Sequence, residues 1–261
     1  MPDLLIDHRG HILEITLNRP EKRNSLTPEM LHQLADCLGE FGQSEQTTIL
    51  ILKGSGAKLF SAGYDISRIP APGTVEADKF ALKKPLDLAV AAVANFPFPT
   101  IAMLNGSVFG GGCELAFACA FRYAADHIIM CMPPAKLGLV YSVEGLERIR
   151  KVIGISHLKK MIYTARQYGV DDLLRFGAID EICPADSLEA KVLELANEMG
   201  ELAPLAHRGH KWIMDRLEKP QLNPAEQEEA KAWLLRSYRS QDAREAKQAF
   251  AQKRPAVFSG R

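Results

Sequence analysis

The spacing of apolar residues predicts that strands alternate with helices from residue 11 to about residue 180. Strands are expected where apolar residues alternate or form a short continuous run, at 11–17, 48–53, 100–104 and 127–132. Helices are expected at 27–41, 75–96 and 113–120, the first of them with Thr27 as N-cap and Pro28 at the first helical position. This alternation indicates the α/β fold class.

Beyond residue 185 the pattern predicts helices alone, at 187–202, 205–217, 223–238 and 240–251. Asn223 and Glu226 have the spacing of a capping box at the start of the third of these helices. We therefore expect an α/β core over residues 1–195 and a helical C-terminal region over 196–261. Such a region has to pack either on the core or on a neighbouring subunit.

Composition and charge exclude several classes of protein. Of 261 residues, 47% are hydrophobic and 25% are charged, as in an ordinary globular protein. The 32 basic residues balance the 32 acidic ones, so no overall field attracts nucleic acid or an acidic membrane. No stretch reaches the roughly 18 apolar residues of a membrane span. The first residues lack a signal-peptide pattern, so a cytoplasmic protein with no membrane or nucleic-acid partner is expected.

The five cysteines point to buried thiols rather than to a disulfide framework. Their number is odd and no two form a C-x-x-C pair; they are Cys37, Cys113, Cys119, Cys131 and Cys183. No grouping of His, Asp and Glu has the spacing of metal ligands either. We expect no metal site.

Two glycine-bearing segments are the best candidates for chemistry. They are Phe60–Ile66 (FSAGYDI) and Asn105–Glu114 (NGSVFGGGCE). Neither fits a dinucleotide-binding or phosphate-binding loop. Three glycines that open a helix let a ligand approach the backbone, and the helix amino end stabilises an oxyanion there. The alternative is a tight strand-to-helix turn without a ligand.

Together, these two segments resemble the signature of the crotonase (enoyl-CoA hydratase/isomerase) superfamily. Asn18–Leu26 (NRPEKRNSL) and Ala249–Pro255 (AFAQKRP) resemble the family's first and last motifs. The resemblance implies a spiral of ββα units with a helical C-terminal region that forms trimers or hexamers. It also implies an acyl-CoA thioester as substrate, stabilised as its enolate, with coenzyme A as part of the substrate and no separate cofactor.

The resemblance assigns roles to individual residues. The backbone N–H groups of Tyr64 and Gly111 would form the oxyanion hole. The chain at Ala62, Asp65 and Ile66 would bind the adenine through backbone groups. The remaining coenzyme A contacts would come from Lys22, Arg23, Ser25 and Lys253. For the three cations among these, the alternative is an ordinary solvated surface.

The reaction is left open between alternatives. Glu114 resembles the first of the two glutamates of a hydratase, whereas the second would fall at Pro134, which cannot carry a proton. An isomerase needs only one base, and Glu114 would serve. Glu144 is a second acid that could replace the missing glutamate, although a solvated helix residue is the simpler interpretation.

The segment Cys131–Tyr141 (CMPPAKLGLVY) resembles the methylmalonyl-CoA decarboxylase branch, with Tyr141 at its active-site tyrosine. That branch has a histidine in place of Tyr64 and a threonine in place of Pro133. The leading expectation is a decarboxylase-like acyl-CoA lyase, and the alternative is an isomerase or hydratase that uses Glu114. A non-catalytic CoA- or RNA-binding protein is the alternative of another class, and the neutral charge disfavours RNA.

Overall fold

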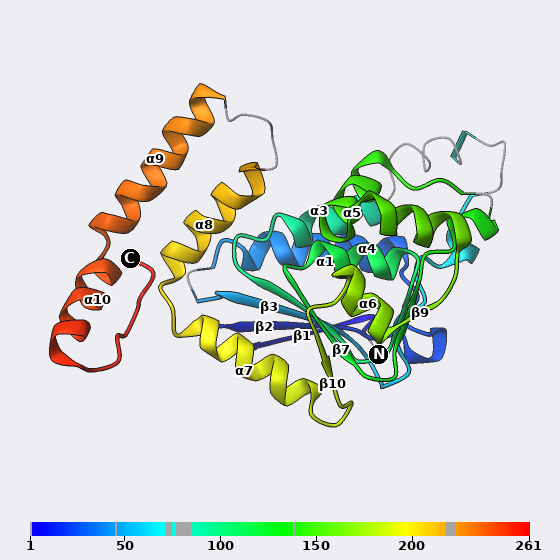
Figure 1. Cartoon of the computed structure of the whole chain (residues 1–261), viewed down its shortest axis with the longest axis horizontal. Helices are drawn as coiled ribbons and strands as arrows, with labels where there is room; N and C mark the ends of the chain where they lie inside the picture. Colours follow the sequence, from blue (N-terminus) through cyan, green and yellow to red (C-terminus); the bar gives the residue numbers. More distant parts are fainter. Residues whose placement is uncertain (1, 45, 71–74, 77–84, 138, 218–222) are drawn as a thin grey trace.

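The computed structural model describes residues 2–44, 46–70, 75–76, 85–137, 139–217 and 223–261, and within them two β-sheets (Figure 1). The larger sheet has the order β1-β2-β3-β5-β7-β10, formed by Leu4–Arg9, Ile12–Leu17, Ile49–Gly54, Thr100–Leu104, Phe121–Ala125 and Glu181–Cys183. The smaller sheet has the order β4-β6-β8-β9, formed by Leu59–Ser61, Ser107–Phe109, Ile129–Cys131 and Tyr168–Gly169. All neighbouring strands are parallel except the pairs β1–β2 and β8–β9.

The chain repeats one unit as it winds through the two sheets. A strand of the larger sheet is followed by a strand of the smaller sheet and then by a helix, as in β5-β6-α4 and β7-β8-α5. Helix α4 spans Gly111–Ala118 and α5 spans Val143–Thr164. Strands β3 and β4 begin the same sequence, and α3 (Pro85–Ala94) follows them. The expected α/β spiral of ββα units is confirmed.

Helices cover both sides of the larger sheet (Figure 1). Helix α1 (Pro28–Phe41) begins as predicted, because the Thr27 hydroxyl accepts a hydrogen bond from the Met30 amide at 3.2 Å. It packs against α3, and α7 (Leu188–Gly200) packs on β3, β5 and β7. The central strands β2, β3 and β5 are almost wholly buried, which agrees with the continuous apolar run predicted at the start of β3. All five cysteines are buried free thiols, as expected.

Several of the remaining elements were predicted and others were missed, among them α5, which has 22 residues. The C-terminal helices α7, α8 (Pro204–Leu217), α9 (Pro224–Arg239) and α10 (Gln241–Gln252) are confirmed. So is the capping box, with mutual bonds of 3.0 and 2.9 Å between Asn223 and Glu226. Strands β1, β4, β6, β7, β9 and β10 were not predicted. The helix expected at 75–96 is confirmed only as α3, and residues 77–84 of that range lie outside the described residues. Short 3-10 turns η1 (Pro20–Lys22), η2 (Ile66–Arg68) and η3 (Pro134–Leu137), together with α6 (Val170–Phe176), complete the described elements.

Helix α7 runs across the boundary expected between residues 195 and 196. Its residues Ala196 and Met199 are buried, so the helix belongs with the core throughout its length. Helix α8 still contacts the core, where Lys211 Nζ donates to the Ala94 carbonyl at 2.8 Å, and we call α8–α10 the C-terminal arm. In Figure 1 the arm extends from one end of the molecule. Within the described residues, no helix is both long and apolar enough to cross a bilayer.

Candidate functional site

Three parallel strands of the smaller sheet bring the candidate segments to one edge. Strand β6 lies between β4 and β8, and all three run in the same direction. The segments that follow them are Ala62–Asp65, Gly110–Glu114 and Met132–Pro134. Because the carboxyl ends of parallel strands meet at one edge, these segments become neighbours although they are far apart in sequence.

The first two segments touch through their backbones at Gly63. A β-carbon built on Gly63 would lie 2.7 Å from the Phe109 carbonyl oxygen and 3.1 Å from the Gly111 nitrogen. Gly63 also has φ of +89°, in the region that favours glycine. Glycine is therefore required here both for the turn and for the close approach of Gly111.

The backbone of Tyr64 is oriented by a bridge to Leu26. The Leu26 amide donates to Gly63 O at 2.9 Å, and the Asp65 amide donates to Leu26 O at 2.9 Å. In such a parallel bridge, the intervening residue directs its own N–H and C=O away from the partner strand. The Tyr64 amide therefore points to the side opposite Leu26.

Gly111 is the first residue of α4, so its N–H has no acceptor within the helix. The amino end of the helix also adds a partial positive charge at this point. Glu114 lies in the first turn of the same helix and is only 2% exposed. The site thus combines backbone donors with one buried carboxyl group.

A cavity of about 300 Å³ lies over this edge. It brings together six predicted site residues, which are Ala62, Tyr64, Ile66, Gly111, Glu114 and Tyr141. Most of its other lining side chains are apolar, namely Ile69, Leu86, Pro133, Pro134, Leu139 and Val140. Glu114 is the only carboxylate among the described residues that line it, and Lys136 is the only cation. The space suits a small, mostly apolar group.

Both tyrosines of the cavity are kept as neutral phenols by their surroundings. Burial raises the pKa of Tyr64 to about 12. Burial also raises the pKa of Tyr141, and the neighbouring Cys113 and Glu114 add to that effect. The Tyr141 hydroxyl lies 3.8 Å from a β-carbon built on Gly110, beside the glycine turn. Near neutral pH, each phenol can therefore donate a proton to a hydrogen bond but not act as a base.

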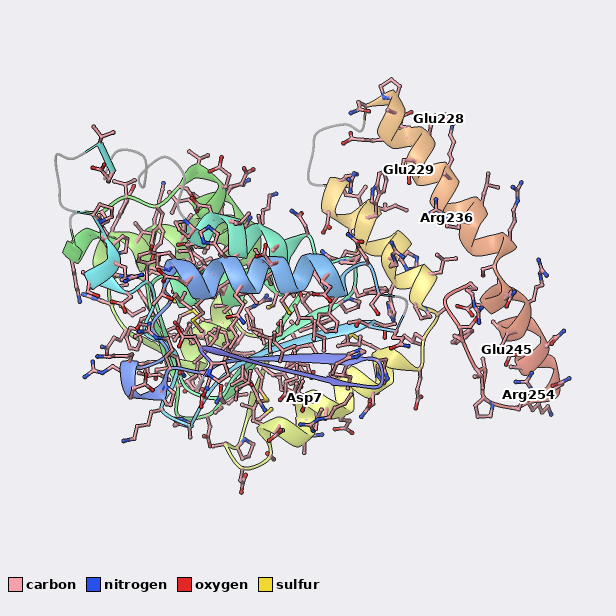
Figure 2. The ribbon with its side chains drawn as sticks, turned by 180° about the vertical axis from the view of Figure 1, so that it is seen from behind. Asp7, Glu228, Glu229, Arg236, Glu245 and Arg254 are labelled. Carbon is pink, nitrogen blue, oxygen red and sulfur yellow. The ribbon has the colours of Figure 1, made fainter. Side chains whose placement is uncertain are left out.

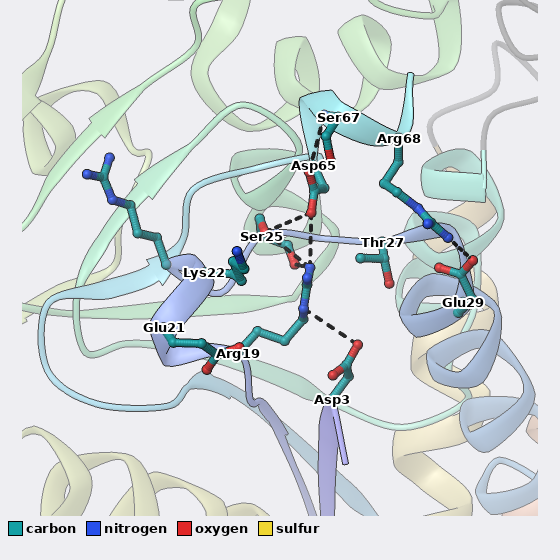
Figure 3. A pocket seen from close by; sticks show the side chains of 11 residues that line it. Asp3, Arg19, Glu21, Lys22, Ser25, Thr27, Glu29, Asp65, Ser67 and Arg68 are labelled. Atoms are coloured by element: carbon teal, nitrogen blue, oxygen red, sulfur yellow. Dashed lines mark hydrogen bonds and ion pairs between the residues drawn. The ribbon is translucent and has the colours of Figure 1, made fainter. Parts of the chain in front are cut away.

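A second, polar hollow of about 760 Å³ collects the other predicted contacts (Figure 3). Lys22, Arg23, Ser25 and Asp65 all line it. At its centre Arg19 donates from Nη1 to the Ser25 carbonyl at 2.8 Å and to Asp65 Oδ2 at 3.3 Å. Hydrogen bonding from Ser67, supported by Arg19, lowers the pKa of Asp65, so this carboxyl stays ionised. Lys22 and Arg23 are exposed and available to an anionic ligand.

Asn24 explains why the Asn18–Leu26 motif accompanies the glycine segments. Its side-chain amide donates to Ser55 O at 3.0 Å and to Leu59 O at 2.8 Å, and its own carbonyl accepts from the Ser61 hydroxyl at 2.8 Å. Arg23 and Asn24 both have positive φ, which turns the chain tightly at this point. The first motif therefore fixes the end of β4, from which Ala62 and Tyr64 continue.

The structure does not bring every predicted residue to the site. Lys253 directly follows α10, at the end of the chain that Figures 1 and 2 place far from η1 and the polar hollow. Within one chain it cannot serve the assigned coenzyme A contact. Glu144 is exposed and lines a separate hollow with Glu147 and Arg148, so it does not replace the missing glutamate.

Sequence reasoning missed three parts of the site. Arg19 was considered only as part of the Asn18–Leu26 motif, with no role of its own. Leu86 and Ser142 were not considered. A signal existed for Ser142, because serine before a helical segment is a favoured N-cap, and its hydroxyl accepts from the Gly145 amide at 3.2 Å. No comparable signal marks Leu86, whose place on the cavity wall depends on how α3 packs.

Comparison with known proteins agrees with this geometry over the whole chain. The family model described as enoyl-CoA hydratase/isomerase matches residues 7–261. Carnitinyl-CoA dehydratase of Escherichia coli K12 is 32% identical over 266 residues, covering 99% of this chain and 98% of that protein. Short-chain-enoyl-CoA hydratase of Clostridium acetobutylicum is 28% identical, covering 97% and 95%.

A solved structure of similar fold is the enoyl-CoA hydratase from Bacillus anthracis, with a TM-score of 0.90 at 28% identity and full coverage of both chains. Its similarity extends over the core and the C-terminal arm together. With the family model, the relatives and the paired glycine segments in agreement, this chain belongs to the enoyl-CoA hydratase/isomerase family of acyl-CoA-processing enzymes.

Proposed function

We propose that this enzyme adds water to, and removes water from, the C2–C3 bond of a short acyl-CoA thioester, with Glu114 as the proton carrier. The observation that carries the proposal is the place of Glu114. It is a nearly inaccessible carboxylate, directed into a cavity whose other described lining residues are mostly apolar. A carboxylate held in such a place is suited to moving a proton rather than to solvating a surface.

The amides of Tyr64 and Gly111 would bind the thioester oxygen. Support comes from the contact at Gly63, the outward direction of the Tyr64 amide and the lack of a helical acceptor for Gly111. Each donor would stabilise the negative charge that the oxygen gains as the enolate forms. Removal of one such donor typically costs about 2.7–4 kcal/mol in the transition state.

Dehydration then proceeds with one carboxylate on one face of the substrate. Glu114 takes the C2 proton, and the electron pair moves onto the thioester oxygen held by the two amides. The enolate returns this pair to form the C2–C3 double bond, and the C3 hydroxyl leaves with the proton that Glu114 carries. Hydration is the reverse. Because one group serves both carbons, we expect hydrogen and hydroxyl to leave from the same face.

The names of the relatives support this reaction over the decarboxylation that the Cys131–Tyr141 segment led us to expect. The relatives compared above are called hydratase and dehydratase. This chain also has Tyr64 and Pro133 where the decarboxylase branch has a histidine and a threonine. Tyr141 is retained as a hydrogen-bond donor to the C3 hydroxyl.

A second candidate is isomerisation, in which the double bond of the substrate moves from C3–C4 to C2–C3. It is favoured by Pro134, which stands where a second, water-activating glutamate would be expected. The same Glu114 would remove a proton from C2 and return it to C4. Both candidates depend on the same carboxylate and differ in whether water enters the product.

Assays with purified enzyme separate these reactions. Crotonyl-CoA and 3-hydroxybutyryl-CoA test hydration and dehydration, 3-hexenoyl-CoA tests isomerisation, and release of CO2 from methylmalonyl-CoA tests decarboxylation. Glu114→Gln is expected to reduce hydration at least about 100-fold. Its control is Glu194→Gln, since Glu194 is an exposed acid of α7 paired with Lys191. Absence of hydration in the wild type, or its persistence in Glu114→Gln, would refute the proposal.

We also propose that the enzyme assembles as a trimer or hexamer through its C-terminal arm. Three apolar side chains of the arm, Met214, Leu217 and Leu235, are at least half exposed in the single chain. A neighbouring subunit would bury them and would also give Lys253 a coenzyme A to contact. Sedimentation velocity tests this proposal, and a monomeric active enzyme would contradict it.

A further inference from the structure

The carboxylate of Glu114 packs against the first turn of α5. A β-carbon built on Gly145 would lie 2.5 Å from Glu114 Oε2, 3.1 Å from Ser142 Oγ and 3.5 Å from Glu114 Cδ. Gly145 is buried, and its φ does not lie in the region that favours glycine. Its lack of a side chain is therefore explained by the space that the Glu114 carboxylate and, less closely, the Ser142 hydroxyl occupy, not by the turn of the backbone.

Two side chains fix this helix end. The Ser142 hydroxyl accepts from the Gly145 amide at 3.2 Å and donates to Asp87 Oδ1 at 3.2 Å. Asp87 lies in the first turn of α3, the helix that also supplies Leu86 to the cavity. The start of α5 is thus held to α3 on one side and faces Glu114 on the other.

The amino end of a helix carries a partial positive charge that attracts a carboxylate. Glu114 lies beside the first turn of α5, where this partial charge is located. The other side of the carboxylate faces the cavity. The carboxylate therefore lies between the first turn of α5 and the space open to a substrate.

We propose that Gly145 is a positioning residue for Glu114 and that Ser142, held by Asp87, keeps Gly145 in place. The inference rests on the proposed function, in which Glu114 carries the proton. A side chain at position 145 pushes the carboxylate toward the cavity and off its line to C2 of the substrate. Because proton transfer depends on sub-ångström placement, the chemical step suffers more than binding does.

Exchange of the C2 protons of butyryl-CoA in D2O, followed by NMR, tests this step directly. In this reaction Glu114 removes a proton from C2, the thioester oxygen takes the electron pair, and a deuteron returns to C2. Gly145→Ala is expected to lower both the exchange rate and kcat for hydration about 10- to 100-fold. KM should stay within about 3-fold, because the backbone donors and the coenzyme A contacts are unchanged.

Matched variants separate positioning from a general loss of structure. Gly39→Ala adds the same methyl group in α1, where nothing lies within 4 Å, and should leave exchange and kcat unchanged. Ser142→Ala should lower kcat in the same sense as Gly145→Ala, and Ser142→Thr should restore it, since threonine also caps helices. If Gly145→Ala does not fold, the comparison of Ser142→Ala with Ser142→Thr tests the positioning of Glu114 instead.

The inference is overturned if folded Gly145→Ala keeps the wild-type exchange rate and kcat, or if its loss is in KM alone. It is also overturned if Ser142→Ala and Ser142→Thr behave alike. A wild-type enzyme that neither exchanges nor hydrates contradicts the proposed function itself, and the inference with it. An active wild type beside an unaffected Gly145→Ala contradicts the inference alone.

Discussion

Gly63 approaches Gly111 so closely that a β-carbon at position 63 would lie 3.1 Å from the Gly111 nitrogen. The contact joins the loop after β4 to the start of α4, and it sets the distance between the two amides assigned to the oxyanion hole. The backbone of Phe109 crowds the same position, since its carbonyl oxygen would be 2.7 Å from that β-carbon. Position 63 is therefore a sensitive test of the site.

Gly63→Ala is expected to lower kcat about 100-fold, the loss typical of one misplaced oxyanion donor. The methyl group has to displace the backbone of Phe109 or Gly111, neither of which is a flexible side chain. The positive φ also strains alanine, with a stability cost of about 1–3 kcal/mol. Steady-state kinetics and thermal unfolding measure the two effects separately.

Gly10→Ala is the control for the strain alone. Gly10 has φ of +62° in the turn between β1 and β2, and nothing lies within 4 Å of the added carbon. We expect a similar loss of stability and unchanged kcat. Equal kinetic losses in the two variants would show that strain, and not the contact with Gly111, limits the reaction.

Gly111→Pro should abolish hydration while the protein still folds. Proline is accepted at the first position of a helix, where its missing N–H breaks no helical hydrogen bond. It removes the one amide proton that the oxyanion hole needs from α4. Gly111→Ala keeps that proton, and its β-carbon meets only the flexible end of Leu86, at 2.9 Å. If circular dichroism shows both variants folded, proline should be inactive and alanine should retain most of the activity.

Substitution of Lys22 or Arg23 should weaken coenzyme A binding and leave the rate of the chemical step unchanged. Both are exposed in the polar hollow, so each is expected to contribute about 1 kcal/mol or less through a solvated ion pair. Lys22→Ala should raise KM for crotonyl-CoA by about 5-fold or less, and the effect should shrink in high salt. The pantetheine thioester lacks the nucleotide, so its KM should not change.

The matched control is Lys159→Ala, which removes an exposed cation from α5. A KM effect of Lys22→Ala that persists with the pantetheine thioester would contradict contact with the nucleotide. So would an equal effect of Lys159→Ala. The double variant of Lys22 and Arg23 should lose more than either single variant, because both cations line the same hollow.

Much of the fold could be predicted where an element has a clear apolar pattern, whereas the 22-residue helix α5, interrupted by non-helical backbone at Gly154, was not predicted. Helix α1 and strand β5 follow directly from apolar periodicity and from the cap at Thr27. Strands β4 and β6 have three residues each, too few for a period of two to be recognised. These short strands matter most for the site, because they bring Gly63 and Gly111 together.

The candidate site could be predicted where its residues share a motif and not where they meet through packing. Glu114 and Gly111 belong to one glycine segment. Gly145 and Ser142 reach Glu114 only because α5 folds back over α4, and nothing in the local sequence encodes that contact. Lys253 was assigned from a motif alone, and because a single chain does not make this contact, it stays a prediction that depends on a neighbouring subunit.

The final segment of the chain should loosen in acid because Glu245 fastens it to α10. Glu245 forms an ion pair with Arg254 and accepts from the Val257 amide at 3.0 Å (Figure 2). These bonds to Arg254 and Val257 lower the pKa of Glu245 to about 2. The fastened state therefore binds fewer protons than the released state, and its advantage is complete above the ordinary pKa of a glutamate. It is lost as the pH falls toward 2.

NMR exchange rates of the Val257 amide between pH 6 and pH 2, corrected for intrinsic exchange, measure this release. Wild-type protection should fall across that acid range while α1 stays protected. Glu245→Gln should show low protection at every pH, because the amide keeps an acceptor but loses the charge that holds Arg254. Glu228→Gln removes an exposed acid of α9 paired with Lys231 at 2.7 Å and should behave as wild type. Protection of Val257 that is independent of pH in the wild type would rule out Glu245 as the fastening group.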